Sequence, residues 1–136
     1  MSYLLDTNVC IVLLEDVAGK VRSKYEETSL EGEPLFLPSV VLFELQYGVE
    51  RSAYPFANRQ RLARFLREGI EVLPFTDNDA ASAAAIRAAL EKQTQPIGPY
   101  DTLIAGQALA RGLTLVTANV REFARVEGLR WADWSM

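Results

Sequence analysis

Short apolar segments alternate with helical stretches along the whole chain, and this alternation limits the possible folds more than any other feature. The segments with strand character are the run that ends at Asp6, then Leu35–Leu37, Ile70–Phe75, Leu113–Thr117 and Gly128–Trp134. Strands that alternate with helices form a parallel sheet covered by helices on both faces. We therefore predict an α/β protein with three α/β/α layers and a central, mainly parallel sheet of about four to five strands. Its 136 residues suit one domain of ordinary size, so residues 1–136 are expected to form a single domain.

Local signals place helices between these strands. Val9–Leu14 and Val17–Glu27 are expected to form one or two short helices. Another helix is expected to begin at Ser39, a good N-cap, and to end at Gly48. A third opens at Pro55 and ends at Gly69. Its expected core side consists of Phe56, Leu62, Phe65 and Leu66.

Two later helices have clear starting signals. Thr76 and Asp79 resemble a capping box that begins an alanine-rich helix over Asp77 to about Lys92, with Asp77 and Asp79 as first-turn acids. Pro99 fits the first position of a helix that ends at Gly112. Asp101 lies in the first turn of that helix, and the residues that follow it on the same face are all small. They are Ala105, Ala108 and Gly112. Such a face would let a neighbouring backbone approach closely.

The chain contains no histidine and a single cysteine, Cys10. It therefore cannot use a Ser-His-Asp triad, a histidine general base or a zinc site with imidazole ligands. Cys10 cannot form an intrachain disulfide, and its apolar neighbours indicate a buried small hydrophobe. Carboxylates and the ions that they bind remain as candidates for catalysis.

Three acidic residues, Asp6, Glu44 and Asp101, lie in apolar surroundings far apart in the sequence. Asp6 ends the first strand, where an open α/β sheet faces its ligand crevice. Each acid also has a purely structural interpretation: a helix cap for Asp6, a buried ion pair for Glu44 and a helix-start acid for Asp101. Three such acids together suggest one shared site.

Carboxylates gathered in one crevice repel one another, which raises their pKa values and costs stability. A divalent cation removes this conflict, and oxygen ligands suit Mg²⁺ or Mn²⁺. A metal so held lowers the pKa of a bound water and neutralises charge on a phosphodiester. The acids therefore favour metal-dependent hydrolysis, with Mg²⁺ or Mn²⁺ as the cofactor.

Five arginines follow one another with no acid between them: Arg51, Arg59, Arg61, Arg64 and Arg67. This strip fits RNA phosphates or a solvated helical face about equally well. The formal net charge of −4 argues against broad nonspecific binding of nucleic acid. A bound cation and a local arginine strip would nevertheless outweigh that total for an RNA backbone.

Four segments, taken together, look like those of PIN-domain ribonucleases. They are Leu-Leu-Asp-Thr-Asn around Asp6, Ser-Val-Val-Leu-Phe-Glu-Leu-Gln-Tyr-Gly around Glu44, Ile-Gly-Pro-Tyr-Asp-Thr-Leu-Ile-Ala-Gly-Gln-Ala around Asp101, and Leu-Val-Thr-Ala-Asn-Val-Arg-Glu-Phe around Asn119. The similarity is strongest to the VapC toxins of prokaryotic toxin–antitoxin pairs and covers essentially the whole chain. It implies a compact α/β/α fold and a Mg²⁺- or Mn²⁺-dependent endoribonuclease that acts as a toxin.

The resemblance also implies roles for individual residues and for partners. Asp6, Glu44 and Asp101 would hold the metal, and Asn119 would complete the catalytic set where many PIN domains carry a fourth Asp. Glu122 could supply the missing charge, and the hydroxyls of Thr7 and Thr117 would support the acids. The protein would form a homodimer and be inhibited by a cognate antitoxin, in a heterotetramer or a larger complex.

Other functions fit the sequence less well. A haloacid-dehalogenase-like phosphatase would carry a second Asp where this chain has Asn8, and no lysine lies near Asp101. A receiver-type signalling domain fails similarly, for lack of paired acids and a late lysine. A catalytically degenerate PIN fold that serves only as a binding or regulatory module remains the main alternative, against which three intact acids argue.

The sequence also bears on location. It contains no apolar run of the roughly 20 residues that a membrane helix needs, and no basic segment precedes its first apolar run. We therefore expect a soluble cytoplasmic protein that does not bind membranes.

Overall fold

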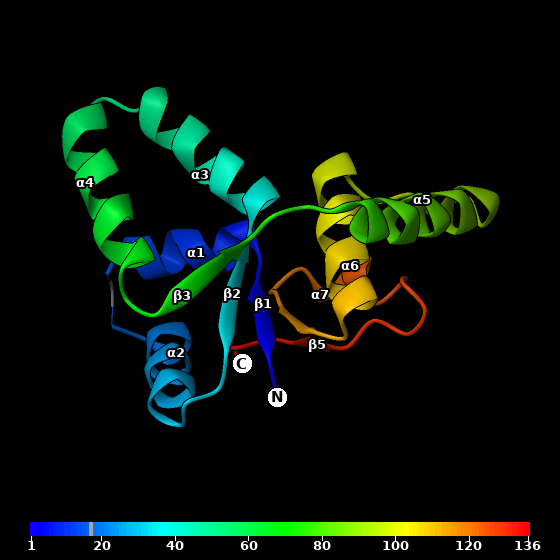
Figure 1. The fold of residues 1–136 in the computed structure, drawn as a ribbon, viewed down its shortest axis with the longest axis horizontal. Coiled ribbons are helices and arrows are strands. Elements are labelled where there is room, and N and C mark those ends of the chain that lie inside the picture. Colours follow the sequence, from blue (N-terminus) through cyan, green and yellow to red (C-terminus); the bar gives the residue numbers. More distant parts are fainter. Residues whose placement is uncertain (17) are drawn as a thin grey trace.

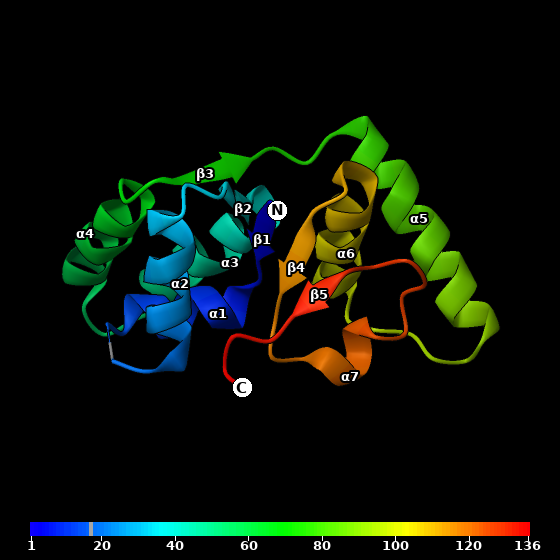
Figure 2. The same cartoon turned by 90° about the horizontal axis from the view of Figure 1, so that it is seen from below.

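A computed structural model describes residues 1–16 and 18–136. Its sheet contains five strands in the order β3-β2-β1-β4-β5, all of them parallel (Figures 1 and 2). The strands are β1 (Tyr3–Leu5), β2 (Leu35–Pro38), β3 (Ile70–Leu73), β4 (Thr114–Val116) and β5 (Trp131–Ala132). The prediction of a parallel sheet in an α/β/α protein is confirmed.

Seven helices in the described part of the chain connect and cover these strands. They are α1 (Thr7–Leu14), α2 (Lys20–Leu30), α3 (Ser39–Glu50), α4 (Pro55–Leu66), α5 (Asp77–Lys92), α6 (Pro99–Arg111) and α7 (Val120–Phe123). Figures 1 and 2 show α1, α2 and α4 on one side of β1, and α5 and α6 on the other. No helix within the described residues has the length and apolar character needed to cross a lipid bilayer.

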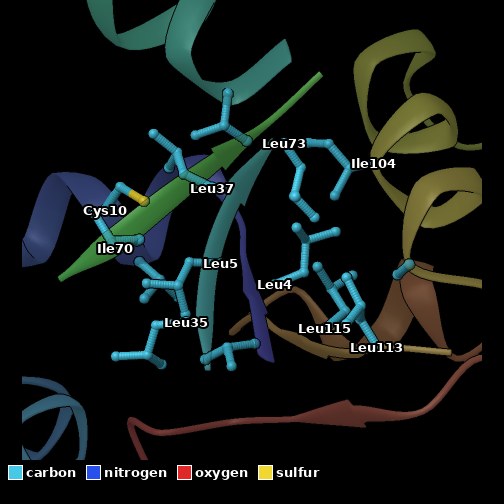
Figure 3. Close-up of a cluster of buried hydrophobic side chains, with 14 of the residues drawn as sticks. Leu4, Leu5, Cys10, Leu35, Leu37, Ile70, Leu73, Ile104, Leu113 and Leu115 are labelled. Atoms are coloured by element: carbon cyan, nitrogen blue, oxygen red, sulfur yellow. The ribbon is translucent and has the colours of Figure 1, made fainter. Parts of the chain in front are cut away.

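The core is centred on β1, because its neighbours β2 and β4 shield it on both edges. Leu4 pairs with Phe36 on one side and with Leu115 on the other, and both Leu4 and Leu5 are fully buried (Figure 3). Such continuous apolar strands are typical of parallel sheets covered on both faces. Cys10 is also fully buried, as predicted, and burial raises the pKa of its thiol well above the usual range.

Several helix boundaries were predicted correctly. Thr76 and Asp79 form the capping box of α5, in which the Thr76 amide donates to Asp79 Oδ2 at 2.8 Å. Pro99 occupies the first turn of α6, and Gly112 ends that helix with a left-handed φ of 65°. The predicted start of the second helical segment at Val17 lies outside the described residues.

Other local predictions were wrong. α3 begins with Pro38 as its N-cap and continues past Gly48 to Glu50, and the Ser39 hydroxyl instead accepts a hydrogen bond from the Phe75 amide at 3.2 Å. Gly48 does not end the helix because its backbone keeps an ordinary negative φ. β3 stops at Leu73, since the following proline has no amide proton for the ladder.

Phe56 does not belong to the core side of α4, and its side chain is 70% exposed. It lies six residues before Leu62, which turns it by about 240° around the helix and away from the buried face. Leu62 and Phe65 are buried, as predicted.

Candidate active site

The site lies at the carboxyl edge of the sheet, where Asp6 directly follows β1. Asp6 is the N-cap of α1, and its Oδ1 accepts a hydrogen bond from the Val9 amide at 3.0 Å. The residue is only 5% exposed. Burial raises the pKa of Asp6, and repulsion from Glu44 and Asp133 adds to this, whereas hydrogen bonds from Thr117 and the Val9 amide oppose it. Asp6 therefore caps a helix and also belongs to an acidic cluster.

Glu44 reaches the same region from α3. It is partly buried, and its Oε1 accepts a hydrogen bond from the Thr7 hydroxyl at 2.7 Å. This bond joins α3 to the first residue of α1, so it orients the Glu44 carboxylate beside Asp6. In the described part of the chain Glu44 forms no salt bridge, which removes the alternative that it is one half of a structural ion pair.

Asp101 enters from the first turn of α6 and is partly buried. Burial, followed by repulsion from Glu122, Asp6 and Glu44, raises the pKa of Asp101 to about 6. Because these charges act on Asp101, the three predicted metal ligands and Glu122 lie close together and form one acidic cluster. The carboxylates come from four different elements of the fold.

The raised pKa predicts how stability depends on pH in the presence of EDTA. Folded Asp101 has a pKa of about 6, whereas an unfolded Asp titrates near 3.9, so the folded state binds this proton more tightly. The resulting stabilisation is complete at about pH 4 and is lost as the pH rises through about 6. Urea unfolding across this range should therefore show a falling free energy of unfolding, and a smaller slope in Asp101→Asn. Equal slopes in the two proteins would contradict the raised pKa.

Asn119 and Glu122 lie close together after β4. Asn119 Nδ2 donates to Glu122 Oε2 at 3.0 Å, and the Asn119 backbone amide donates to the Thr117 hydroxyl at 2.9 Å. Asn119 thus directs its amide group to Glu122, and Glu122 is the residue whose charge acts most strongly on Asp101. We infer that Glu122 occupies the part of the site where the fourth acid was expected, with Asn119 as the residue that orients it.

One acidic residue of this region was missed in the sequence. Asp133 follows β5 directly, at the same edge of the sheet as Asp6, and its charge contributes to the raised pKa of Asp6. Its Oδ1 accepts hydrogen bonds from the Ser135 amide at 2.9 Å and from the Ser135 hydroxyl. The signal was present, because an acid at the carboxyl end of a parallel strand was the same argument that selected Asp6.

The chemistry of these side chains fits a divalent cation. Among the described residues, no carboxylate of the cluster forms an ion pair with Lys or Arg; the cluster consists of Asp6, Glu44, Asp101, Glu122 and Asp133. Burial and repulsion raise the pKa values of Asp6 and Asp101. Within the described part of the chain no three acidic side chains are close enough to form a ready-made ligand set. The donors that the cluster offers are carboxylate oxygens, which suit Mg²⁺ or Mn²⁺.

The arginines of the strip differ in their surroundings. Arg59 pairs with Glu50 at 2.8 Å, and the Arg51 guanidinium lies 5.6 Å from the centre of the Tyr47 ring. Arg61 lines a hollow of about 230 Å³ beside Glu44. It also lines a second hollow next to α1 and α2, together with Arg64. Arg61 thus shares a hollow with Glu44, one of the acids of the site.

Comparison with known proteins identifies the class to which this fold and site belong. Residues 3–129 match the PIN domain family, so the chain belongs to that family. It is 41% identical over 99% of both chains to the tRNA(fMet)-specific endonuclease VapC of Shigella flexneri. It is 37% identical over 98% of both chains to the protein of the same name from Salmonella typhimurium.

The solved structures agree with this assignment. A crystal structure of VapBC2 from Rickettsia felis, bound to a DNA fragment from its promoter, superimposes with a TM-score of 0.92 at 33% identity. The match covers 98% of this chain and 99% of that chain. Within the PIN-domain family the protein is therefore a VapC-type nuclease, and the resemblance predicted from the sequence is confirmed.

Proposed function

We propose that this VapC-type nuclease is a Mg²⁺- or Mn²⁺-dependent endoribonuclease, the toxin of a toxin–antitoxin pair. The observation that carries the metal dependence is the acidic cluster around Asp6 and Asp101, which is buried or partly buried and has no basic partner among the described residues. At neutral pH the charges of such a cluster cost stability, and a bound cation compensates them. A phosphodiester backbone needs the same positive charge in order to approach.

Each residue of the cluster has a distinct role in this proposal. Asp6, Glu44 and Asp101 would hold the metal, which when bound supplies an activated water and neutralises charge on the scissile phosphate. Thr7 holds the Glu44 carboxylate in place, and Thr117 and the Val9 amide keep Asp6 oriented. Since the chain contains no histidine, Glu122 is the group near Asp101 that is best placed to accept a proton.

The relatives support a substrate and a partner. Because the two relatives described above are named tRNA(fMet)-specific endonucleases and cover the whole chain, we propose transfer RNA as the substrate class. The neighbouring solved structures are VapBC complexes, which supports a cognate antitoxin that occludes the site. In this proposal the protein acts in the cytoplasm as a homodimer, and binds its antitoxin as a heterotetramer or a larger complex.

A cleavage assay on total cellular RNA tests this function. The purified protein, free of antitoxin, is incubated with RNA in Mg²⁺ and in EDTA, and Asp6→Ala serves as the control for contaminating nucleases. Discrete fragments that require both the metal and Asp6 are expected, and sequencing them identifies the RNA and the cut site. Intact RNA with folded protein in every condition would favour the binding-module alternative.

Arg61 and Arg64 are expected to contribute to RNA binding through phosphate contacts. Replacing both with Gln should weaken binding and reduce the slope of log K against log salt concentration by about 0.7 for each lost contact. The matched control is Arg59→Gln, because the Arg59 guanidinium is already paired with Glu50. Binding titrations over a range of salt concentrations measure both effects. If the double variant and the parent have the same slope, these arginines form only a solvated helical face.

A further inference from the structure

Four side chains form an exposed row that begins beside the acidic cluster: Tyr100, Phe43, Tyr47 and Arg51, which we call the aromatic row. The rings of Tyr100, Phe43 and Tyr47 are 45%, 53% and 61% exposed. Large aromatic side chains contribute much binding free energy when they are buried. Three neighbouring exposed rings therefore indicate a surface that binds another molecule.

Distances between the members make the row continuous. The ring centres of Phe43 and Tyr100 are 5.9 Å apart in an edge-on arrangement, and the Arg51 guanidinium lies 5.6 Å from the centre of the Tyr47 ring. Phe43, Tyr47 and Arg51 are each four residues apart, so they lie on one face of α3 and its C-cap. The aromatic row thus starts where Tyr100 of α6 meets Phe43 of α3, and it continues along one face of α3.

The position of the row relates it to the acids. Phe43 precedes Glu44 in α3, and Tyr100 precedes Asp101 in α6, so two members flank two predicted metal ligands. α3 and α6 contact each other, and α3 begins beside α6 (Figure 1). A strand of RNA held at the acids would therefore meet these rings directly.

We propose that the aromatic row binds unpaired bases of the RNA substrate by stacking, with Arg51 next to a phosphate; this inference rests on the proposed endoribonuclease function. Every base presents a π-face, and single-stranded RNA is commonly held on aromatic and arginine side chains. From Phe43 to Arg51 the helix rises by about 12 Å. That length matches about three or four nucleotides at a spacing of about 3.4 Å per base. A row of this length therefore has room for about three or four nucleotides of the strand.

Kinetics on a defined single-stranded RNA that contains the cleavage site tests the row. Phe43→Ala and Tyr47→Ala are each expected to raise KM about tenfold, since stacking on one ring contributes roughly that factor or more. Phe43→Tyr and Tyr47→Phe keep the ring and should behave like the parent. Tyr54→Ala and Phe56→Ala are matched controls, because these rings are also exposed but lie outside the row. The controls should leave KM unchanged.

A modified RNA separates stacking from indirect effects. An RNA with abasic residues next to the cut should bind the parent about tenfold more weakly, and the alanine variants should lose little further affinity on it. Equal KM values for the alanine variants and the parent on intact RNA would overturn the inference while leaving the endoribonuclease function standing. No RNA binding by the parent would overturn both.

The oligomeric state of the variants distinguishes an RNA-binding surface from a contact between copies of the chain. Sedimentation velocity of each alanine variant should match that of the parent, because the row is assigned to RNA. If the alanine variants become smaller assemblies and lose activity together, the rings belong to a contact between copies of the chain. That result would also overturn the inference.

Discussion

Replacing Asp101 with asparagine is expected to reduce the rate of RNA cleavage by about a hundredfold or more, the loss typical when one electrostatic group of an active site is removed. The amide keeps the shape of the carboxylate but loses the negative charge that would help to hold the cation. Stability should change in the opposite direction, since the raised pKa of about 6 means that the ionised carboxylate destabilises the metal-free fold at neutral pH. Loss of activity with a gain of stability distinguishes a functional acid from a structural one.

Thermal unfolding and cleavage assays on the same preparations measure both effects. Asp77→Asn is the matched control, because Asp77 is also an acid in the first turn of a helix but is exposed and outside the cluster. Mg²⁺ at millimolar concentration should raise the Tm of the parent by mass action and raise that of Asp101→Asn less. An Asp101→Asn protein that still cleaves RNA at the rate of the parent would remove Asp101 from the site.

The candidate site could be predicted from the sequence to the extent that its residues lie at strand ends and helix starts. Asp6 and Asp101 were found in this way, and Glu44 was found because an acid on an apolar helix face needs a partner. The bond between Thr7 and Glu44 could not be derived, because it depends on how α1 and α3 pack against each other. The repulsion between Glu122 and Asp101 likewise depends on the distance between α7 and α6, which the periodicity of the sequence does not determine.

The role of Asp79 illustrates the same limit. Its place in the first turn of α5 and in the capping box was predicted, but the carboxylate also accepts hydrogen bonds from Arg111 at 3.0 Å and Gln107 at 3.3 Å. Burial raises the pKa of Asp79, yet the hydrogen bonds from Arg111 and Thr76 outweigh this and lower it overall. These bonds join α5 to α6, whereas the sequence signal concerned only the start of α5.

The sequence predicts that a neighbouring backbone approaches α6 at the small residues in line with Asp101, but it does not say which element approaches. Ala105 and Ala108 are fully buried, as small residues at a contact should be. α5 approaches α6 very closely at Gly106, where a Cβ would lie 2.6 Å from the Ala83 Cβ and 2.7 Å from the Ala83 backbone. Gly106 lies between the positions that the helical spacing selected, and only the crossing of the two helices determines which residue meets Ala83.

Gly106→Ala should therefore destabilise the protein by about 2–3 kcal/mol, although alanine is the better helix former by about 1 kcal/mol. The added methyl group meets the backbone of Ala83 and not the flexible end of a side chain, so α5 and α6 must move apart. Their separation would also disturb the hydrogen bonds that join Asp79 to α6. For a domain of this size the Tm should fall by roughly 10 °C, measured by calorimetry or circular dichroism.

Gly48→Ala is the matched control for this effect. Gly48 also lies inside a helix, but a Cβ at this position would meet no atom within 4 Å. The same chemical change should therefore stabilise the protein by about 0.5–1 kcal/mol, the ordinary gain in helix propensity. Opposite signs for the two glycines would assign the loss at Gly106 to the contact between α5 and α6. If both substitutions stabilise the protein, the two helices can separate at little cost and the approach at Ala83 is not a constraint on the fold.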